Sequence, residues 1–422
     1  MRLPRGRLEG TLRVPGSKSV TNRALVAAAL AAGRSEIAAP LDSDDTRVLA
    51  AALVRLGATI APGPNAWQVA GPLSGSGREE AVLDIGPAGT PARFLLALLP
   101  ALPGRFVLDG SPRMRERPMG PLVEALRARG ARIEPLGAEG FLPVRIEGGT
   151  LTGGEVSIRA DVSSQFVSAL LLVSPVVAGG LSVRTEGRPV SGAYVELTRR
   201  VLASFAPEGA YRPARFVVPG DDSAACFPIA GALVSGGRVR LEGLDPQSPQ
   251  PDAVFRRWAV EAGGDLRWEG KGEDTVLVVQ GRGAGSAGSV DAVDADVDPA
   301  PDAALPLAAL LAFSRGTSRL RGAARLRAKE SDRLSAALDL LERSGAAARA
   351  EGTADDPTLA IEGPRGRPRR AGFVAMDDHR VAMTAAVLAL TLPEGCTLDT
   401  PEVVSKSYPR FWDDWTGLVA RR

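Results

Sequence analysis

Lysine, histidine and cysteine are scarce in this chain, and each shortage narrows the chemistry available to it. Only four of the 51 basic residues are lysines, and the 422 residues include one histidine and two cysteines. Cys226 and Cys396 form no cluster with His379, so they have neither the spacing of a zinc site nor the number of a disulfide framework. The sequence therefore excludes a zinc site of ordinary spacing and fits a reducing compartment.

The sequence also lacks a large excess of charge of one sign and an apolar run long enough to span a membrane. The formal net charge is +2, so no overall basic field favours nucleic acid. The first residues, MRLPRGRLEG, contain no apolar segment of a secretory signal. The longest apolar stretch, Phe166 to Leu181, is interrupted and falls short of the ~20 residues of a membrane span. These absences predict a soluble, cytoplasmic protein.

The apolar residues that are present fall into six similar segments. Each opens with small or polar residues suited to a helix N-cap, continues through an Ala/Leu-rich run, and ends at a glycine break before a short β-branched strand. Because these runs are apolar on nearly every face, we expect them to form helices inside a domain. The segments begin at Gly16, Gly86, Asp161, Asp221, Pro301 and Asp377.

Amphipathic segments with a charged face alternate with the apolar ones. They cover residues 45–60, 119–133, 193–206, 252–266, 329–345 and 408–422. The combined unit recurs at intervals of roughly 60–80 residues, which is too long for a small solenoid repeat. The pattern predicts an α/β protein of six βαβ-containing units, three per domain, with the buried helices covered by outer sheets. A change of composition at residues 213–220 marks the expected domain boundary.

Cationic residues cluster at or near the starts of the predicted buried helices. Helix N-termini offer unpaired N–H groups and the positive end of the helix dipole, which suit phosphate or carboxylate. The plainer alternative is that the serine and aspartate residues there only cap helices, but it does not explain why lysine and histidine gather with them. The pattern favours a substrate with more than one anionic group. The cations are Lys18, Arg23, Arg117, Arg333, Arg380 and Lys406.

Other common catalytic motifs are absent, which leaves proton transfer by lysine and carboxylates. There is no Gly-x-x-x-x-Gly-Lys-Ser/Thr loop and no convincing dinucleotide fingerprint. Asp302 can take a proton from a hydroxyl, Glu330 can deliver or remove one, and Lys18 can donate one. The acids at 291–298 lack the glycine and final glutamate of a calcium loop. The arginine-rich stretch 365–370 is expected to be a solvated loop.

Nine motifs, in order along the chain, resemble those of the 5-enolpyruvylshikimate-3-phosphate (EPSP) synthase family. They are PGSKSVTNRAL, AGTPARFLLA, RMRERPMG, VSSQFVSALLL, PVSGAY, PDAALPLAA, RAKESDRL, DDHRVAM and SKSYPRFW. The resemblance implies a two-domain inside-out α/β barrel of six βαβαββ repeats. It places one domain at 16–219, on the shikimate 3-phosphate side. The other domain, 1–15 with 220–422, takes phosphoenolpyruvate, and the active site lies in the cleft between them.

The activity implied by the resemblance is transfer of the enolpyruvyl group of phosphoenolpyruvate to the 5-hydroxyl of shikimate 3-phosphate. Phosphate leaves through a tetrahedral intermediate, in a step of chorismate and aromatic amino acid biosynthesis that glyphosate inhibits. The family uses no metal or organic cofactor. We expect a monomer with these two small substrates as its partners, bound to neither nucleic acid nor membrane.

The site residues implied by the resemblance follow motif by motif. Lys18, Asp302 and Glu330 would be catalytic, with the division of proton transfers among them left open. The shikimate 3-phosphate set is Lys18, Ser19, Arg23, Ser163, Ser164, Gln165, Ser191, Tyr194, Asp302 and Lys329. The phosphoenolpyruvate set is Lys18, Gly89, Arg117, Gln165, Arg333, His379, Arg380 and Lys406.

Three residues depart from the family pattern. Pro87 replaces a polar residue and removes a donor near the phosphoenolpyruvate motif, which puts affinity there in question. Pro91 falls in the first turn of a predicted helix, where a missing N–H costs little. Arg325 stands where some members have asparagine. Gly89 leaves room for glyphosate, so we expect sensitivity to it.

Two alternative functions remain at this point. UDP-N-acetylglucosamine enolpyruvyl transferase shares the fold, but that family has Lys-Asn where Lys18 and Ser19 stand, and an acid cysteine before Arg117. A non-catalytic anion-binding relative is the other alternative. A nucleic-acid end-modifying enzyme such as an RNA 3'-phosphate cyclase would need a nucleophilic histidine, whereas His379 lies in the synthase-like motif.

Overall fold

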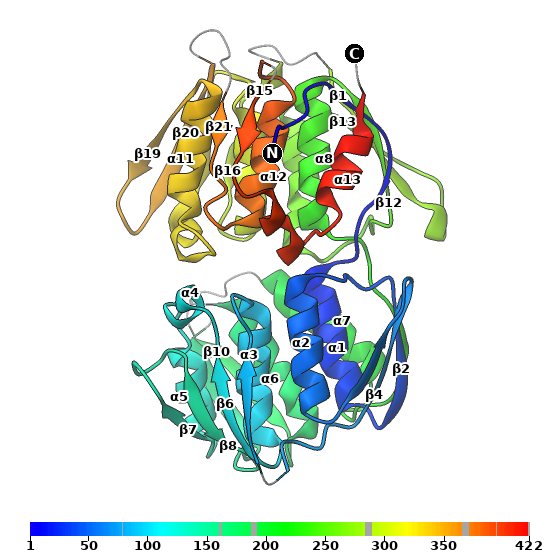
Figure 1. Ribbon diagram of the computed structural model, residues 1–422, viewed down its shortest axis with the longest axis vertical. Coiled ribbons are helices and arrows are strands. Elements are labelled where there is room, and N and C mark those ends of the chain that lie inside the picture. The colour runs from blue at the N-terminus through cyan, green and yellow to red at the C-terminus, as the bar shows by residue number, and fades with distance from the viewer. Residues whose placement is uncertain are drawn as a thin grey trace. The chain divides into compact units, whose positions relative to one another are not determined.

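A computed structural model describes residues 1–77, 79–159, 163–186, 192–282, 289–364, 371–393 and 395–420. The chain forms two compact units. The N-terminal unit is Gly16–Pro219, and the C-terminal unit combines Met1–Pro15 with Gly220–Arg422. The chain therefore begins in the C-terminal unit, builds the N-terminal unit, and then returns (Figure 1).

The interior of the N-terminal unit is made of three helices, α1 (Lys18–Leu30), α3 (Gly89–Leu98) and α6 (Ser164–Val173). Every residue of α3 is buried, as are all residues of α1 from Val20 onwards. Each of the three helices contacts the other two. Their Ala/Leu-rich surfaces are apolar all round because they have neighbours on every side.

Sheets and amphipathic helices surround this interior. The parallel strand pairs β5–β6 and β9–β10 are joined through α3 and α6, the crossover that parallel pairing requires. The last strand, β11, lies parallel to β2, so the end of the unit pairs with its beginning. The sheets are β11 (Arg215–Val217), β2 (Gly33–Ala38), β4 (Ala66–Gly71) and β3 (Thr59–Pro62); β5 (Glu80–Asp84), β6 (Arg105–Asp109), β8 (Val144–Glu147) and β7 (Arg132–Pro135); and β10 (Leu181–Glu186) with β9 (Gly154–Arg159). The outer helices are α2 (Asp44–Arg55), α4 (Pro112–Arg115), α5 (Gly120–Arg127) and α7 (Gly192–Phe205).

The C-terminal unit repeats this arrangement. Its interior helices are α8 (Asp222–Ser235), α10 (Ala304–Leu311) and α12 (His379–Ala389), and every residue in them is buried. Its larger sheets are β13 (Asp265–Glu269), β14 (Val276–Gln280), β12 (Arg238–Glu242), β1 (Arg7–Arg13) and β23 (Val419–Ala420); and β16 (Asp294–Asp296), β18 (Thr317–Arg321), β20 (Pro357–Pro364) and β19 (Ala346–Gly352). The short pairs are β15 (Val290–Asp291) with β17 (Ser314–Arg315), and β21 (Gly372–Phe373) with β22 (Thr397–Leu398).

Outer α-helices and short 3₁₀-helices complete the C-terminal unit. The helices are α9 (Phe255–Glu261), α11 (Arg333–Ser344) and α13 (Phe411–Leu418). The 3₁₀-helices that carry polar residues discussed below are η3 (Pro251–Val254), η5 (Pro301–Ala303), η6 (Ala323–Ala328) and η7 (Pro401–Lys406). The predicted alternation of buried and amphipathic helices in an α/β chain is thereby confirmed. Among the described residues, no helix combines the length and apolar character that crossing a membrane requires.

Five of the six predicted amphipathic helices are shorter than their segments, and three of these segments (45–60, 119–133 and 252–266) continue into the strands β3, β7 and β13. The last one was expected to run to residue 422, but α13 ends at Leu418, and Val419 pairs with Leu8 in an antiparallel bridge between β23 and β1. The segment from Lys329 was also expected to be helical. Instead α11 starts at Arg333, because the Asp332 side chain accepts hydrogen bonds from the first turn and caps it. The arginine-rich stretch 365–370 lies outside the described residues.

The first strand ties the beginning of the chain into the C-terminal unit. β1 lies between β12 and β23, and its Leu8 is completely buried. We therefore expect Leu8→Ala to lower the free energy of unfolding by about 2–5 kcal/mol, since it removes buried methyl groups and leaves a cavity. Urea denaturation measures this. Glu9→Ala, at the exposed neighbour on the same strand, should stay within about 0.5 kcal/mol. Equal effects of the two substitutions would contradict the placement of β1.

Candidate active site

A buried guanidinium lies at the centre of the polar cluster in the C-terminal unit. Arg333, the first residue of α11, is 1% exposed. Its Nε and Nη2 donate to the two oxygens of Asp378 at 2.8 and 3.2 Å. Nη1 donates to Asp302 Oδ1 at 2.7 Å and Nη2 to Glu330 Oε2 at 2.9 Å. Burial alone would lower the pKa of Arg333, but the three carboxylates outweigh burial and raise it.

Asp302 receives cations from three directions. Its carboxylate lies 3.2 Å from Lys329 Nζ and 3.3 Å from Arg380 Nη2, in addition to the contact with Arg333. Burial favours the neutral acid, yet the positive charges of Arg380, Lys329 and Arg333 hold the pKa of Asp302 well below its usual range. The carboxylate is therefore ionised and able to accept a proton.

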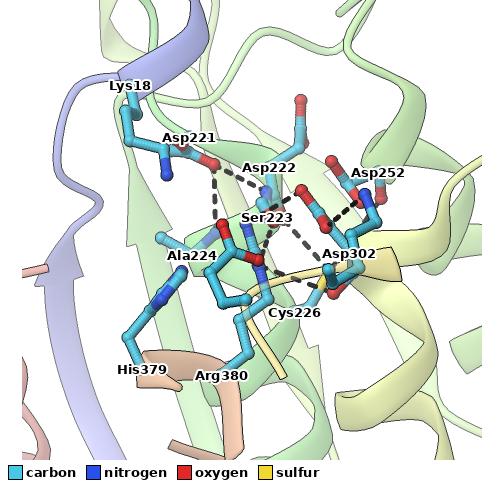
Figure 2. A network of polar contacts seen from close by, with 12 residues as sticks. Lys18, Asp221, Asp222, Ser223, Ala224, Cys226, Asp252, Asp302, His379 and Arg380 are labelled. Carbon is cyan, nitrogen blue, oxygen red and sulfur yellow. Dashed lines mark hydrogen bonds and ion pairs between the residues drawn. The ribbon is translucent and has the colours of Figure 1, made fainter. Parts of the chain in front are cut away.

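Arg380 is fixed between two other interior elements of the same unit. It is the second residue of α12 and is 6% exposed. Its Nη1 donates to the hydroxyl of Ser223 in the first turn of α8, and its Nη2 donates to Asp302 (Figure 2). The N-cap Asp378 accepts the backbone N–H of Arg380 at 2.9 Å. Arg380 thus lies where the starts of α8, η5 and α12 meet.

Glu330 lies between two cations. One oxygen accepts from Arg333, and the other lies 3.5 Å from Lys406 Nζ at the end of η7. Lys406 is 8% exposed, so this ion pair is largely shielded from water. His379, the first residue of α12, is buried with its Nδ1 3.6 Å from Asp378 Oδ1. The cluster therefore combines carboxylates with several cations in a small buried region.

In the N-terminal unit, a lysine and an aspartate from successive helices are paired. Lys18 is the first residue of α1, and its Nζ lies 3.0 Å from Asp45 Oδ2 in the first turn of α2. The start of α2 is fixed by a capping box between Ser43 and Thr46. The Lys18 ammonium is thus held at the start of α1 while 15% of its side chain remains exposed.

Arg23 lies deep in the packing of α1, α6 and α7. It is 1% exposed and donates to Thr198 Oγ1, Ser168 Oγ and the carbonyl oxygens of Ser19 and Tyr194. Burial lowers the pKa of its guanidinium to about 10. Arg23 therefore joins three helices, which is a structural task in addition to the substrate contact predicted for it.

Arginine side chains crowd the start of α3. A Cβ added at Gly89 would lie 2.6 Å from Arg117 Nη1 and 2.8 Å from Arg93 Nη1, so any larger residue there would displace these guanidinium groups. Arg93 donates to the Gly89 carbonyl oxygen at 2.9 Å. On α6, Gln165 Nε2 donates to Thr90 Oγ1 at 3.2 Å, and this bond connects the starts of α3 and α6. Pro91 lies in the first turn of α3, as expected.

The predicted site residues divide between the two units. Ser191 lies outside the described residues. The N-terminal unit carries Lys18, Ser19, Arg23, Gly89, Arg117, Ser163, Ser164, Gln165 and Tyr194. The C-terminal unit carries Asp302, Lys329, Glu330, Arg333, His379, Arg380 and Lys406, and side-chain contacts link these except His379, which reaches the cluster through Asp378.

Four residues that hold these groups were not among the predicted site residues. Asp378 binds Arg333 through both of its oxygens, Ser223 binds Arg380, Asp45 binds Lys18, and Arg93 binds the start of α3. Asp378 lies in the motif DDHRVAM, which is the signal that could have found it. No local sequence pattern predicts the pairs Ser223–Arg380 and Asp45–Lys18, whose members come from different helices.

Two further points from the sequence analysis are the departure at Arg325 and the acidic segment 291–298. Arg325 Nε lies 3.2 Å from Asp298 Oδ1, so the departure at Arg325 has a local carboxylate partner. Within the described ranges, no three or more His, Cys, Asp and Glu side chains are grouped so that they can hold a metal ion.

Comparison with known proteins identifies the family. A model of EPSP synthase (3-phosphoshikimate 1-carboxyvinyltransferase) matches residues 3–415. The chain belongs to this family. A 3-phosphoshikimate 1-carboxyvinyltransferase of Bordetella bronchiseptica is 38% identical to it, over 100% of this chain and 98% of that protein.

Solved structures agree on the fold. The EPSP synthase from Acinetobacter baumannii is similar with a TM-score of 0.80 at 26% identity, covering 99% of this chain and 97% of that one. The enolpyruvyl transferase NikO from Streptomyces tendae has a TM-score of 0.76 at 19% identity, covering 99% and 96%, and this likeness concerns the fold alone. The predicted two-domain enolpyruvyl transferase fold is confirmed.

Proposed function

We propose that this chain is a 3-phosphoshikimate 1-carboxyvinyltransferase, which transfers the enolpyruvyl group of phosphoenolpyruvate to the 5-hydroxyl of shikimate 3-phosphate and releases phosphate. The observation that carries the proposal is the ionised Asp302 held among Lys329, Arg333 and Arg380, in a chain of the EPSP synthase family. An ionised carboxylate can take a proton from a hydroxyl, and the cations around it suit a substrate with two anionic groups.

The proposed phosphoenolpyruvate contacts use cations that are already positioned. Arg333, Arg380 and Lys406 are each 8% exposed or less, and each is held by a carboxylate. Fixed donors of this kind bind a carboxylate or phosphate without reorganising. The remaining residues assigned to this substrate are Lys18, Gly89, Arg117, Gln165 and His379.

The proposed shikimate 3-phosphate contacts lie mainly at the starts of α1 and α6. Ser163 is the N-cap of α6, and Ser164 and Gln165 are its first residues. Hydroxyl groups and free N–H groups at a helix start suit a phosphate. The other residues assigned to this substrate are Lys18, Ser19, Arg23, Ser191, Tyr194, Asp302 and Lys329.

In this proposal two residues transfer protons and a third supports the intermediate. Asp302 takes the proton of the 5-hydroxyl while the oxygen of that hydroxyl attacks carbon 2 of phosphoenolpyruvate. Glu330, held between Arg333 and Lys406, acts at the methylene carbon, which gains a proton in the addition and loses one in the elimination. Lys18 supports the tetrahedral intermediate. Because these residues belong to different units, the proposal requires both units to act on the same pair of substrates.

Inorganic phosphate release tests the proposed function. The purified protein receives phosphoenolpyruvate and either shikimate 3-phosphate or UDP-N-acetylglucosamine, with a chelator present. We expect release with shikimate 3-phosphate only. Release only with the nucleotide sugar would overturn the assignment, and absence of release with both would favour a binding-only relative. The proposal also includes a cytoplasmic monomer, which cell fractionation and light scattering test.

Substitution of Gly89 tests the crowding at the start of α3. In Gly89→Ala the new methyl group meets Arg117 Nη1 at 2.6 Å, so the guanidinium has to move. We expect the KM for phosphoenolpyruvate to rise roughly tenfold or more, since a misplaced charged donor costs about 1.5–3 kcal/mol. Inhibition by glyphosate should weaken in parallel. Gly417→Ala serves as control because a Cβ there meets no atom within 4 Å. Unchanged kinetics in Gly89→Ala would refute the role of Arg117.

A further inference from the structure

Four aspartates of the C-terminal unit gather around the start of α8. They are Asp221, Asp222, Asp252 and Asp302 (Figure 2). Three of them have clear partners. Asp221 caps α8 by accepting two backbone N–H groups, Asp222 is paired with Arg256, and Asp302 is surrounded by cations.

Asp252 differs from the other three. It is 4% exposed, and its Oδ1 is buried with no hydrogen-bond partner. Among the ion pairs of the described chain, none includes its carboxyl. A buried carboxylate without a cation and with an unbonded oxygen is costly, and the neutral acid costs much less. These two observations favour the neutral form of the Asp252 carboxyl.

The surrounding charges reinforce this assignment. Burial raises the pKa of Asp252 to about 8, and the negative charge of Asp302 contributes to the rise while Arg380 opposes it. The groups that face Asp252 are Asp221, Asp222 and Cys226 of α8, Asp302 of η5 and Arg380 of α12, with Arg256 of α9 paired to Asp222.

Neighbouring hydrogen bonds hold the backbone segment that carries Asp252. Gln250, just before η3, donates from Nε2 to the Gly220 carbonyl oxygen at 2.7 Å. Its Oε1 accepts the backbone N–H of Asp222 at 3.3 Å. These two bonds hold η3 against the first turn of α8, so Asp252 has little freedom to turn towards water.

We propose that Asp252 is a positioning residue for the reaction. Its carboxyl stays protonated and therefore neutral, so the positive charge of Arg380 interacts with Asp302 and with the incoming anion. This inference rests on the proposed function, in which Arg380 binds phosphoenolpyruvate. When Asp252 ionises at alkaline pH, a second carboxylate competes for Arg380, and the anion is bound less tightly. Asp252 thereby sets the alkaline limit of substrate binding.

The pH dependence of KM tests this role. In the unaltered protein, the KM for phosphoenolpyruvate should rise about fivefold between pH 8 and pH 9, as expected when binding requires the protonated form of a group with a pKa of about 8. Asp252→Asn copies the neutral acid, so its KM should match that of the unaltered protein at pH 7 and stay level to pH 9. Asp265→Asn, at a surface position of the same unit, should follow the unaltered protein.

The other outcomes are equally informative. The same alkaline rise in Asp252→Asn would overturn the proposal, as would a loss of kcat at every pH with KM unchanged. Thermal unfolding is a readout that does not depend on turnover. The melting temperature of Asp252→Asn should exceed that of the unaltered protein by an amount that grows between about pH 4 and about pH 8 and then levels off, because the unfolded chain loses the Asp252 proton near pH 4 and the folded chain only near pH 8. Absence of turnover in the unaltered protein together with this melting pattern would refute the proposed function but not the protonation of Asp252.

Discussion

Replacing Asp302 with asparagine is expected to lower kcat by roughly 100- to 10,000-fold, the usual contribution of a positioned general base. The amide preserves the shape of the side chain and can still accept a hydrogen bond from Arg333, so the cluster should remain folded. Removal of one negative charge beside Arg380 and Lys329 should leave the affinity for phosphoenolpyruvate equal or higher. Steady-state kinetics and calorimetric binding measure the two effects separately.

A matched control lies four residues earlier in the chain. Asp298 is paired with Arg325, and 42% of its side chain is exposed, so Asp298→Asn should change kcat little. Glu330→Gln should lower kcat as well, because it removes the carboxylate between Arg333 and Lys406. Full turnover in either Asp302→Asn or Glu330→Gln would remove that residue from the proton transfers.

The largest loss of stability is expected at Arg333. Arg333→Met leaves Asp378, Asp302 and Glu330 without the guanidinium that joins them. Loss of one partner from a buried charge network costs about 3–5 kcal/mol, because the remaining charges are uncompensated. Urea denaturation followed by circular dichroism should show this decrease in the free energy of unfolding of the C-terminal unit.

The same helix offers the control for Arg333. Arg343 is paired with Asp339, and 41% of its side chain is exposed, so Arg343→Met should cost less than about 1 kcal/mol. Adding Asp378→Asn to Arg333→Met should recover part of the lost stability, since it neutralises the completely buried carboxylate. Equal losses at Arg333 and Arg343 would show that the network contributes no more than a surface pair.

The interior helices were predictable because their signal is local. An Ala/Leu-rich run after a polar N-cap residue is sufficient to predict α1, α6 or α12, and Ser163 and Asp378 do cap their helices. The pairing of β1 with β23 joins opposite ends of the chain. No local pattern carries that information, and this is why the last helix was drawn through Val419.

The residues of the candidate site were predictable where they belong to one of the nine motifs. Three of the four lysines were expected in the site, and Lys18, Lys329 and Lys406 each form an ion pair with an aspartate or glutamate of their own unit. The partner of Lys18 could not be predicted in the same way, because Asp45 and Lys18 meet only when α1 and α2 pack together. The buried position of Arg23 likewise depends on three helices whose sequences lie far apart.

The most direct test of the account follows the enolpyruvyl carbons. Phosphoenolpyruvate labelled with carbon-13 at its methylene carbon is incubated with the protein and shikimate 3-phosphate in deuterium oxide, and the product is examined by NMR. We predict a labelled enol ether on the 5-oxygen of shikimate 3-phosphate, with deuterium in the methylene group, because addition and elimination exchange its protons. Labelled pyruvate with an additional phosphate on the acceptor would show phosphoryl transfer instead, and would contradict the account.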